Sequence, residues 1–232
     1  MASPSLLTLT VESLQGSHDV VFEAERLTCC GWVGRDRTAL QAHIDELSRL
    51  GVAPPTRVPI YMDLSPYLIT SDDEIDVVSA STSGEVEYVL LRRDREMWVT
   101  VGSDQTDRDI ETRSIVASKQ MCPKYLARRC WPYGELQDHW DRLELRSWVM
   151  RDGHRTLYQQ SSLASILGPD ALMAGVRESP SPPSASMVLF SGTVPTTAGL
   201  VYGDAYELEL RDPVMRRTIA GAYRVRVLPQ LI

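Results

Sequence analysis

The sequence predicts a mostly β or α+β fold with few, short helices. Segments with the alternation typical of strands greatly outnumber helical segments. The two kinds also do not alternate along the chain, as a doubly wound α/β fold would require. At 232 residues, with 43% hydrophobic and 24% charged residues, the chain is long enough to bury a sizeable core. We find no internal repeat.

The first part of the chain is expected to contain two strands and one helix. Residues 6–11 and 20–23 alternate apolar and polar side chains. Residues 29–34 form a short apolar entry to the helix, and the Thr38–Gln41 spacing matches a capping box at its start. The apolar face of the helix continues to Leu50, before Gly51 as the natural stop.

Most of the remaining chain is expected to form strands. Asp152 and Gly153 are a strong turn signal for a hairpin. Residues 161–167 are expected to form a short helix ending at Gly168, residues 112–119 fit either a strand or a helix, and the Pro/Ser-rich residues 179–186 form a loop. The expected strands are residues 58–64, 75–78, 84–91, 97–101, 143–150, 154–158, 187–191, 205–211 and 219–228.

Charge and cysteine usage narrow the classes of function. The net charge of −7 and the absence of a Lys/Arg cluster argue against nucleic-acid binding. Only two of the 24 basic residues are lysines, Lys119 and Lys124, which singles out Lys119 as a candidate for chemistry. No apolar run is long enough to cross a membrane. The four cysteines lack metal-binding or redox spacing, which favours a reducing compartment. We therefore expect a cytoplasmic protein.

Glu85 and Glu87 are the strongest candidates for chemistry. Residues two apart in a strand share a face, so these carboxylates project together and repel unless one is protonated or a cation lies between them. The acidic loop at residues 102–109 follows and offers a third oxygen donor for a hard cation such as Mg²⁺ or Mn²⁺. The alternative is a solvated strand face followed by an acidic turn.

A second Glu-x-Glu pair, Glu207 and Glu209, competes for the same interpretation. No acidic loop follows it at a comparable distance. A solvated sheet face therefore accounts for it better.

The ordered set of motifs resembles the fumarylacetoacetate hydrolase superfamily, specifically the branch known as domain of unknown function 2848. The resemblance covers roughly residues 30 to 228, outside the first strands. The motifs are Val33-Gly34-Arg35, the His43/Glu46 pair, Glu85-Val86-Glu87, residues 104–109 (Asp-Gln-Thr-Asp-Arg-Asp), Ser118-Lys119, Asp152-Gly153, Ser161-Ser162, Gly192-Thr193 and Gly203-Asp204.

The resemblance implies a mixed β-sandwich roll of the fumarylacetoacetate hydrolase C-terminal-domain type. It implies N-terminal strands at residues 1–30 and a catalytic domain at residues 31–232, in what is expected to be one continuous domain. The metal would be held by Glu85, Glu87 and Asp104, with Asp107 or Asp109 as alternative third ligands. The resemblance implies catalytic roles for His43, Glu46 and Lys119. It implies that Arg108, Gly192 and Thr193 contact the substrate.

The resemblance also implies a divalent-metal enzyme that acts on a 2-oxo acid or 1,3-dicarbonyl substrate through an enolate, by C–C hydrolysis or decarboxylation. His43, oriented by Glu46 on a lid segment, would be the general base, although the same spacing also arises in an ordinary surface pair. A hydratase, dehydratase or tautomerase is compatible with the same site. A non-catalytic binding module on this scaffold is a further alternative. The lack of a lysine at residues 60–63 mildly favours either such a module or an altered choice of substrate, whereas the presence of Glu85, Glu87, Asp104 and Lys119 together argues against a module. A homodimer is expected.

Overall fold

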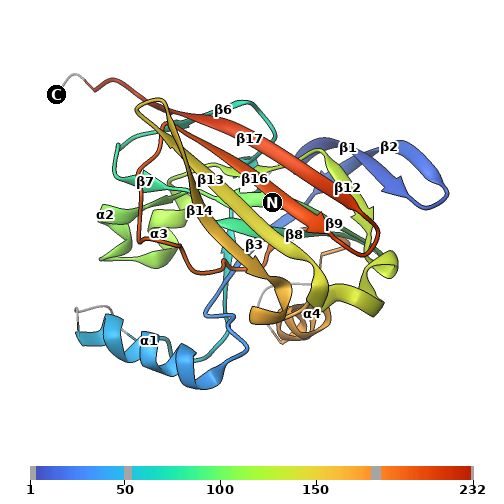
Figure 1. Cartoon of the computed structure of the whole chain (residues 1–232), viewed down its shortest axis with the longest axis horizontal. Helices are drawn as coiled ribbons and strands as arrows, with labels where there is room; N and C mark the ends of the chain where they lie inside the picture. The colour runs from blue at the N-terminus through green and yellow to red at the C-terminus, as the bar shows by residue number, and fades with distance from the viewer. Residues whose placement is uncertain (1–3, 50–53, 179–183, 231–232) are drawn as a thin grey trace.

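The computed structural model describes residues 4–49, 54–178 and 184–230 and contains two main sheets and a few helices (Figure 1). The larger sheet has ten strands, with the order β2-β1-β12-β9-β8-β15-β3-β4 and with β11 and β5 joined beside β9. The smaller sheet has five strands in the order β14-β13-β16-β17-β6, and β10 pairs with β7. The prediction of a mostly β fold with few helices is confirmed.

The elements follow one another along the chain with short connections in most places. The strands of the first half are β1 (Ser5–Ser13), β2 (Gly16–Ala24), β3 (Arg26–Gly31), β4 (Ile60–Leu64), β5 (Ile69–Thr70), β6 (Glu74–Val77), β7 (Thr82–Ser83), β8 (Val86–Arg93), β9 (Glu96–Asp104) and β10 (Thr106–Asp107). Those of the second half are β11 (Lys124–Leu126), β12 (Arg129–Pro132), β13 (Glu144–Arg151), β14 (His154–Ser162), β15 (Ser186–Phe190), β16 (Ala205–Asp212) and β17 (Arg217–Val227). The α-helices are α1 (Arg37–Arg49), α2 (Arg108–Glu111), α3 (Ile115–Gln120) and α4 (Pro169–Arg177), and 3₁₀ turns are η1 (Pro66–Leu68), η2 (Tyr133–Glu135), η3 (Gln137–Arg142) and η4 (Leu163–Ser165).

Strands β8 and β9 lie at the centre of the large sheet and are buried on both faces. Tyr88 and Leu90 of β8 belong to the core between the two sheets, together with side chains of β13, β16 and β17. Val89 and Leu91 point to the opposite face, into a second core formed with side chains of β1–β4, β11 and β15. Because side chains alternate along a strand, Glu87 shares this second face with Val89. The glutamate is therefore carried into a buried layer.

The N-terminal strands are part of the large sheet. Strand β1 pairs with β2 and, in parallel, with β12, while β3 lies between β15 and β4. Residues 29 and 30 thus belong to a strand, and their assignment to the entry of a helix was wrong. They are buried on both faces of the sheet, so they show no alternation that would mark them as a strand.

Two helix ends also differ from the expectation. Asp36, rather than Thr38, caps α1, because its Oδ1 accepts hydrogen bonds from the backbone N–H groups of Thr38 and Ala39. Gly168 precedes α4 as its N-cap instead of ending an earlier helix, and Pro169 occupies the first turn. The expected stop of α1 at Gly51 and most of the loop at residues 179–186 lie outside the described residues.

Residues 112–119, which fit either a strand or a helix, contain Thr112, the C-cap residue of α2, and all but the last residue of the helix α3. Within the described ranges, no helix combines the length and the apolar character needed to cross a membrane.

Candidate metal centre

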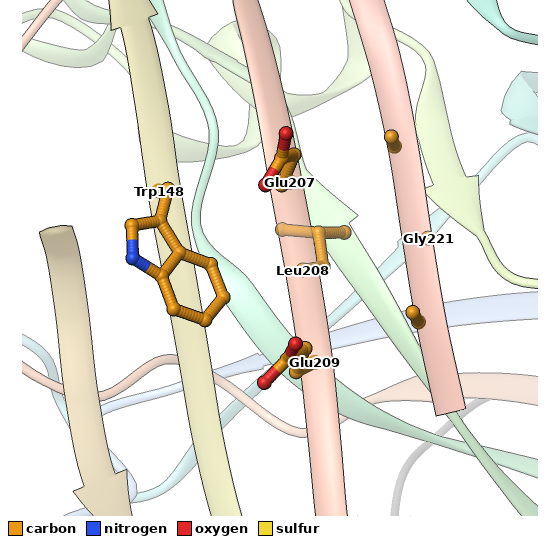
Figure 2. A pocket seen from close by; sticks show the side chains of 7 residues that line it. Trp148, Glu207, Leu208, Glu209 and Gly221 are labelled. Atoms are coloured by element: carbon orange, nitrogen blue, oxygen red, sulfur yellow. The ribbon is translucent and has the colours of Figure 1, made fainter. Parts of the chain in front are cut away.

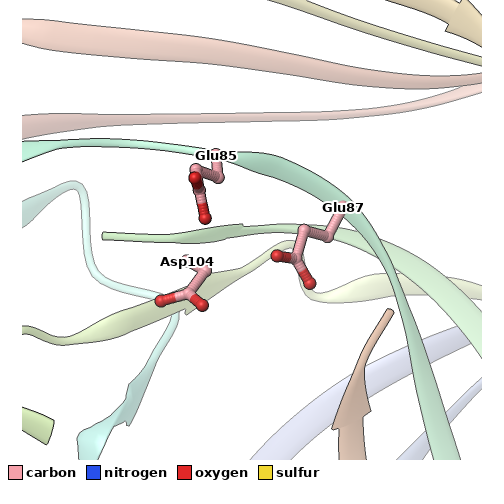
Figure 3. Close-up of side chains that lie close together, drawn as sticks. All are labelled: Glu85, Glu87 and Asp104. Atoms are coloured by element: carbon pink, nitrogen blue, oxygen red, sulfur yellow. The ribbon is translucent and has the colours of Figure 1, made fainter. Parts of the chain in front are cut away.

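The β8–β9 hairpin places three carboxylates on one face. Glu85 immediately precedes β8, Asp104 is the last residue of β9, and the backbone N–H of Asp104 donates to the Glu85 carbonyl at 3.0 Å. Glu87 pairs with Gly102. Residues directly opposite each other in antiparallel strands share a face, so Glu85, Glu87 and Asp104 project together (Figure 3). One carboxylate oxygen from each lies within 4.8 Å of the other two.

Glycine at position 102 is needed by this arrangement. A Cβ atom built on Gly102 would lie 2.6 Å from the Tyr125 carbonyl oxygen and 2.7 Å from Val89 Cγ2. Strand β11 therefore packs closely against β9. Their antiparallel register sets Lys124 directly opposite Asp104.

Two lysines hold the Asp104 carboxylate, one on each oxygen. Lys119 Nζ, from α3, lies 2.5 Å from Asp104 Oδ2 and 3.2 Å from Glu85 Oε2. Lys124 Nζ lies 2.9 Å from Asp104 Oδ1 and also donates to the carbonyls of Gln105 and Cys122. Both ammonium groups are buried, so these ion pairs act where solvent screens them little.

The positive neighbours decide the ionisation of Asp104 and Glu85. Burial alone would raise the pKa of Asp104, but Lys119 and Lys124 outweigh it and lower that pKa to about 2. The pKa of Glu85 is likewise lowered, because Lys119 and Arg108 overcome its burial. Burial would lower the pKa of Lys119, but Asp104 and Glu85 raise it well above its usual value. Lys119 therefore remains a cation at neutral pH.

Glu87 is the exception among the three carboxylates. Its side chain is fully buried, and the backbone N–H of Gly192 donates to Oε2 at 2.7 Å. Among the described residues, the buried Oε1 atom has no hydrogen-bond partner. Burial, reinforced by the charges of Asp104 and Glu85, raises the pKa of Glu87 well above that of a free glutamate. A buried carboxylate oxygen without a donor is costly unless a proton or a cation reaches it.

The donor set fits a hard divalent cation. Three carboxylates offer only oxygen ligands, which suit Mg²⁺ or Mn²⁺ and leave other coordination positions for water or substrate. A cation bound here would give Glu87 Oε1 the partner that it does not have among the described residues. Of the alternative third ligands, Asp107 caps α2 by accepting from the N–H groups of Asp109 and Ile110, and Asp109 is exposed.

Arg108 forms an ion pair with Glu85 of the triad. Its guanidinium group is buried, with Nη2 3.0 Å from Glu85 Oε1, Nε donating to the Ser83 hydroxyl at 2.7 Å and Nη1 donating to Glu111 at 2.8 Å. Arg108 therefore orients a carboxylate of the triad. Its contact with substrate stays a prediction.

The 191–193 loop borders the centre on the side of Glu87. The Gly192 N–H is bound to Glu87, and the Thr193 hydroxyl donates to the Val86 carbonyl at 2.8 Å. Both groups of the predicted substrate contact thus have protein partners. Gly192 adopts a φ of +86°, which glycine reaches without strain.

His43 and Glu46 lie on α1, and their side chains are outside what the structure describes. Their predicted roles as general base and orienting group stay predictions.

The competing pair, Glu207 and Glu209, lies on the outer face of the five-stranded sheet. Both line a shallow hollow of about 330 Å³ with Trp148 and Gly221 (Figure 2). Glu207 also forms an ion pair with Arg155 at 2.7 Å. None of the triad residues lines this hollow. The pair belongs to an open sheet face with ion pairs, as the sequence indicates.

Sequence reasoning missed two residues of the centre. Lys124 is one of only two lysines in the chain, and that scarcity was the available signal. Gln159, whose side-chain oxygen accepts from the Val86 N–H, gave no signal, because its orientation depends on an irregularity in β14.

Comparisons with known proteins agree with this fold. The sequence profile of a family described as proteins of unknown function (DUF2848) matches residues 30–223. No curated protein sequence matches the chain.

Several solved structures have the same architecture. A proposed fumarylacetoacetate isomerase/hydrolase from Oleispira antarctica has a TM-score of 0.64 at 17% identity, covering 93% of this chain and 99% of that one. 2-Keto-3-deoxyarabinonate dehydratase has a TM-score of 0.62 at 15% identity, covering 88% and 74%. A proposed fumarylacetoacetate hydrolase family protein from Yersinia pestis CO92 has a TM-score of 0.62 at 14% identity, covering 94% and 100%. At these identities the likeness shows a shared fold.

Proposed function

The chain belongs to the DUF2848 family and has a fold of the fumarylacetoacetate hydrolase type, and from this premise we propose that it is a divalent-metal-dependent enzyme. Its substrate would be a 2-oxo acid or a 1,3-dicarbonyl compound, and the reaction C–C hydrolysis or decarboxylation through an enolate. The fold alone does not assign this activity. The site supports it.

The observation that carries the proposal is the triad of carboxylates, one buried oxygen of which has no partner in the described part of the chain. Glu85, Glu87 and Asp104 would hold the cation, and Glu87 Oε1 would gain the partner that it lacks. When bound, a divalent cation supplies Lewis acidity, which polarises a carbonyl and stabilises negative charge that develops on oxygen.

The residues around the triad each contribute a defined effect. Lys119 keeps its proton, because its pKa is raised, so its role would be a fixed positive charge beside the substrate oxygen rather than a base. Lys124 and Arg108 hold Asp104 and Glu85 in place. His43, oriented by Glu46, would act as general base. Gly192 and Thr193 would border the substrate carboxylate. We further propose that the enzyme acts on a small molecule, forms a homodimer and is located in the cytoplasm.

A hydratase or dehydratase is the second candidate. It is favoured by the shared fold with 2-keto-3-deoxyarabinonate dehydratase, whose name describes loss of water from a 2-keto acid. The same positive charges would stabilise an enolate in either reaction.

Cation binding tests the proposal directly. Isothermal titration with Mn²⁺ and Mg²⁺ should show binding to the wild-type protein and none to the Glu87→Gln variant, because the substitution removes a charged ligand. Glu96→Gln is a matched control, since Glu96 is an exposed acid on the same hairpin paired with Arg93. Binding that Glu87→Gln leaves unchanged would refute the site.

Activity separates an enzyme from a non-catalytic module. Oxaloacetate, acylpyruvates and 2-keto-3-deoxy sugar acids should be assayed with and without EDTA. Turnover that EDTA abolishes supports the enzyme, and its product distinguishes hydrolysis or decarboxylation from dehydration. Cation binding without turnover of any of these compounds supports a binding module.

A further inference from the structure

The peptide unit at Val86, between the two glutamates of the triad, is held on both sides by a buried side-chain clamp. We infer that Gln159, acting through Thr193, is a positioning residue that fixes the directions of Glu85 and Glu87. The inference rests on the proposed cation site and identifies which residue outside the triad sets its affinity.

The clamp is a closed ring of hydrogen bonds. The Val86 N–H donates to Gln159 Oε1 at 2.9 Å, Gln159 Nε2 donates to Thr193 Oγ1 at 2.8 Å, and the Thr193 hydroxyl donates to the Val86 carbonyl at 2.8 Å. Two further bonds anchor the amide, from Ser147 Oγ to Oε1 at 3.2 Å and from Nε2 to the Val194 carbonyl at 2.6 Å.

The orientation of the Gln159 amide is fixed by its partners. The Val86 N–H can only donate, so it must face the oxygen, and the Val194 carbonyl can only accept, so it must face the nitrogen. A flipped amide would set its nitrogen against the Val86 N–H and its oxygen against the Val194 carbonyl. In the buried Gln159 side chain, the oxygen therefore acts only as an acceptor and the nitrogen only as a donor.

A β-bulge brings Gln159 to this position. Ser147 pairs with Gln159, but Trp148 pairs with Leu157, so Tyr158 is an extra residue in β14. In a regular strand Tyr158 and Gln159 would point to opposite faces, whereas both are buried here. Bulges redirect side chains and occur often beside functional sites. The bulge in β14 therefore directs the Gln159 amide toward Val86 of β8.

The clamp acts on the triad because Val86 is bonded to both of its neighbours in the chain. Fixing the N–H and the carbonyl of Val86 fixes the peptide planes on either side of it, and with them the Cα positions from which the Glu85 and Glu87 side chains extend. The same loop also supplies the Gly192 N–H that binds Glu87 Oε2. Outer groups of this kind typically change metal affinity by about 10- to 100-fold when substituted.

Thr193→Val against Thr193→Ser is the sharpest test. Valine keeps the shape of threonine but cannot donate to Val86, whereas serine keeps the hydroxyl. Mn²⁺ affinity, measured by isothermal titration, should fall by about 10- to 100-fold in Thr193→Val and remain near that of the wild type in Thr193→Ser. The electron paramagnetic resonance spectrum of bound Mn²⁺ should change only in Thr193→Val.

Gln159→Glu supplies an independent variant if Thr193→Val does not fold. The carboxylate can still accept from Val86 but cannot donate to Thr193 or Val194, so the same fall in affinity is expected. Gln160→Glu is its control, because Gln160 is the exposed neighbour and receives the same charge. Melting temperatures measured in EDTA separate loss of stability from loss of affinity.

The outcomes distinguish the inference from the function on which it rests. Wild-type protein that does not bind Mn²⁺ refutes the cation site and the clamp with it. Wild-type protein that binds, with Thr193→Val and Gln159→Glu binding equally well, refutes the clamp alone. A melting temperature that falls while affinity and spectrum stay unchanged also overturns it, since the residues would then serve only stability.

Discussion

Replacing Lys124 by methionine should strongly destabilise the cation-free protein. Methionine fills a similar volume, so the change removes mainly the ammonium group, which is fully buried against Asp104 Oδ1 and backbone carbonyls. Removing one partner of a buried ion pair costs about 3–5 kcal/mol of unfolding free energy, because the other charge stays buried. Lys119 still pairs with Asp104, which reduces the loss, while the abandoned carbonyls increase it. We expect a loss of at least about 3 kcal/mol.

Urea unfolding in EDTA, followed by fluorescence of the buried tryptophans, measures this loss. Arg226→Met is the matched control, because Arg226 pairs with Asp76 on an exposed surface and its loss should change stability little. In the Asp104→Asn background, Lys124→Met should cost clearly less, because the buried carboxylate charge is already gone. A loss below about 1 kcal/mol, or an equal loss in both backgrounds, would refute the reasoning.

Two further predictions concern Glu87 and Gly102. Burial raises the pKa of Glu87, so above the usual glutamate pKa the folded cation-free protein binds more protons than the unfolded chain. Its free energy of unfolding should therefore fall as the pH rises through this range. Urea titrations at several pH values should show that Glu87→Gln removes this slope. A slope that persists in the variant would assign it to another group. Gly102→Ala should cost about 1–3 kcal/mol of unfolding free energy, because the new Cβ would meet the Tyr125 carbonyl, whereas Gly134→Ala, with open space around it, should cost little; equal losses in thermal unfolding would contradict this packing.

The sequence predicted the parts of the site that depend on local pattern. Turn residues and alternation located the β8–β9 hairpin, and its pairing sets Glu85 beside Asp104. The resemblance to the domain of unknown function 2848 is confirmed by the family match, and the expected fold of the fumarylacetoacetate hydrolase type is confirmed by the solved structures. The third oxygen donor and Lys119 follow from the order of motifs along the chain.

The remaining features depend on contacts between distant segments. Strand β3 is buried on both faces and therefore carries no alternation. Gly168 ends one helical pattern and precedes another, and only packing decides between these roles. Gln159 faces inward because one residue of β14 is unpaired, which no periodic pattern reveals. Lys124 is buried by its pairing opposite Asp104, although a lysine is ordinarily expected at the surface.

The place of β15 in the large sheet has a consequence for the order in which the molecule can assemble. This strand lies between β8 and β3, so the two halves of the sheet join only when a segment near residue 190 inserts between them. Until then, a growing or truncated chain would present two open strand edges, each a template for pairing with another chain. A nascent chain released before that point would therefore be prone to aggregate, even though its acidic hairpin is already synthesised.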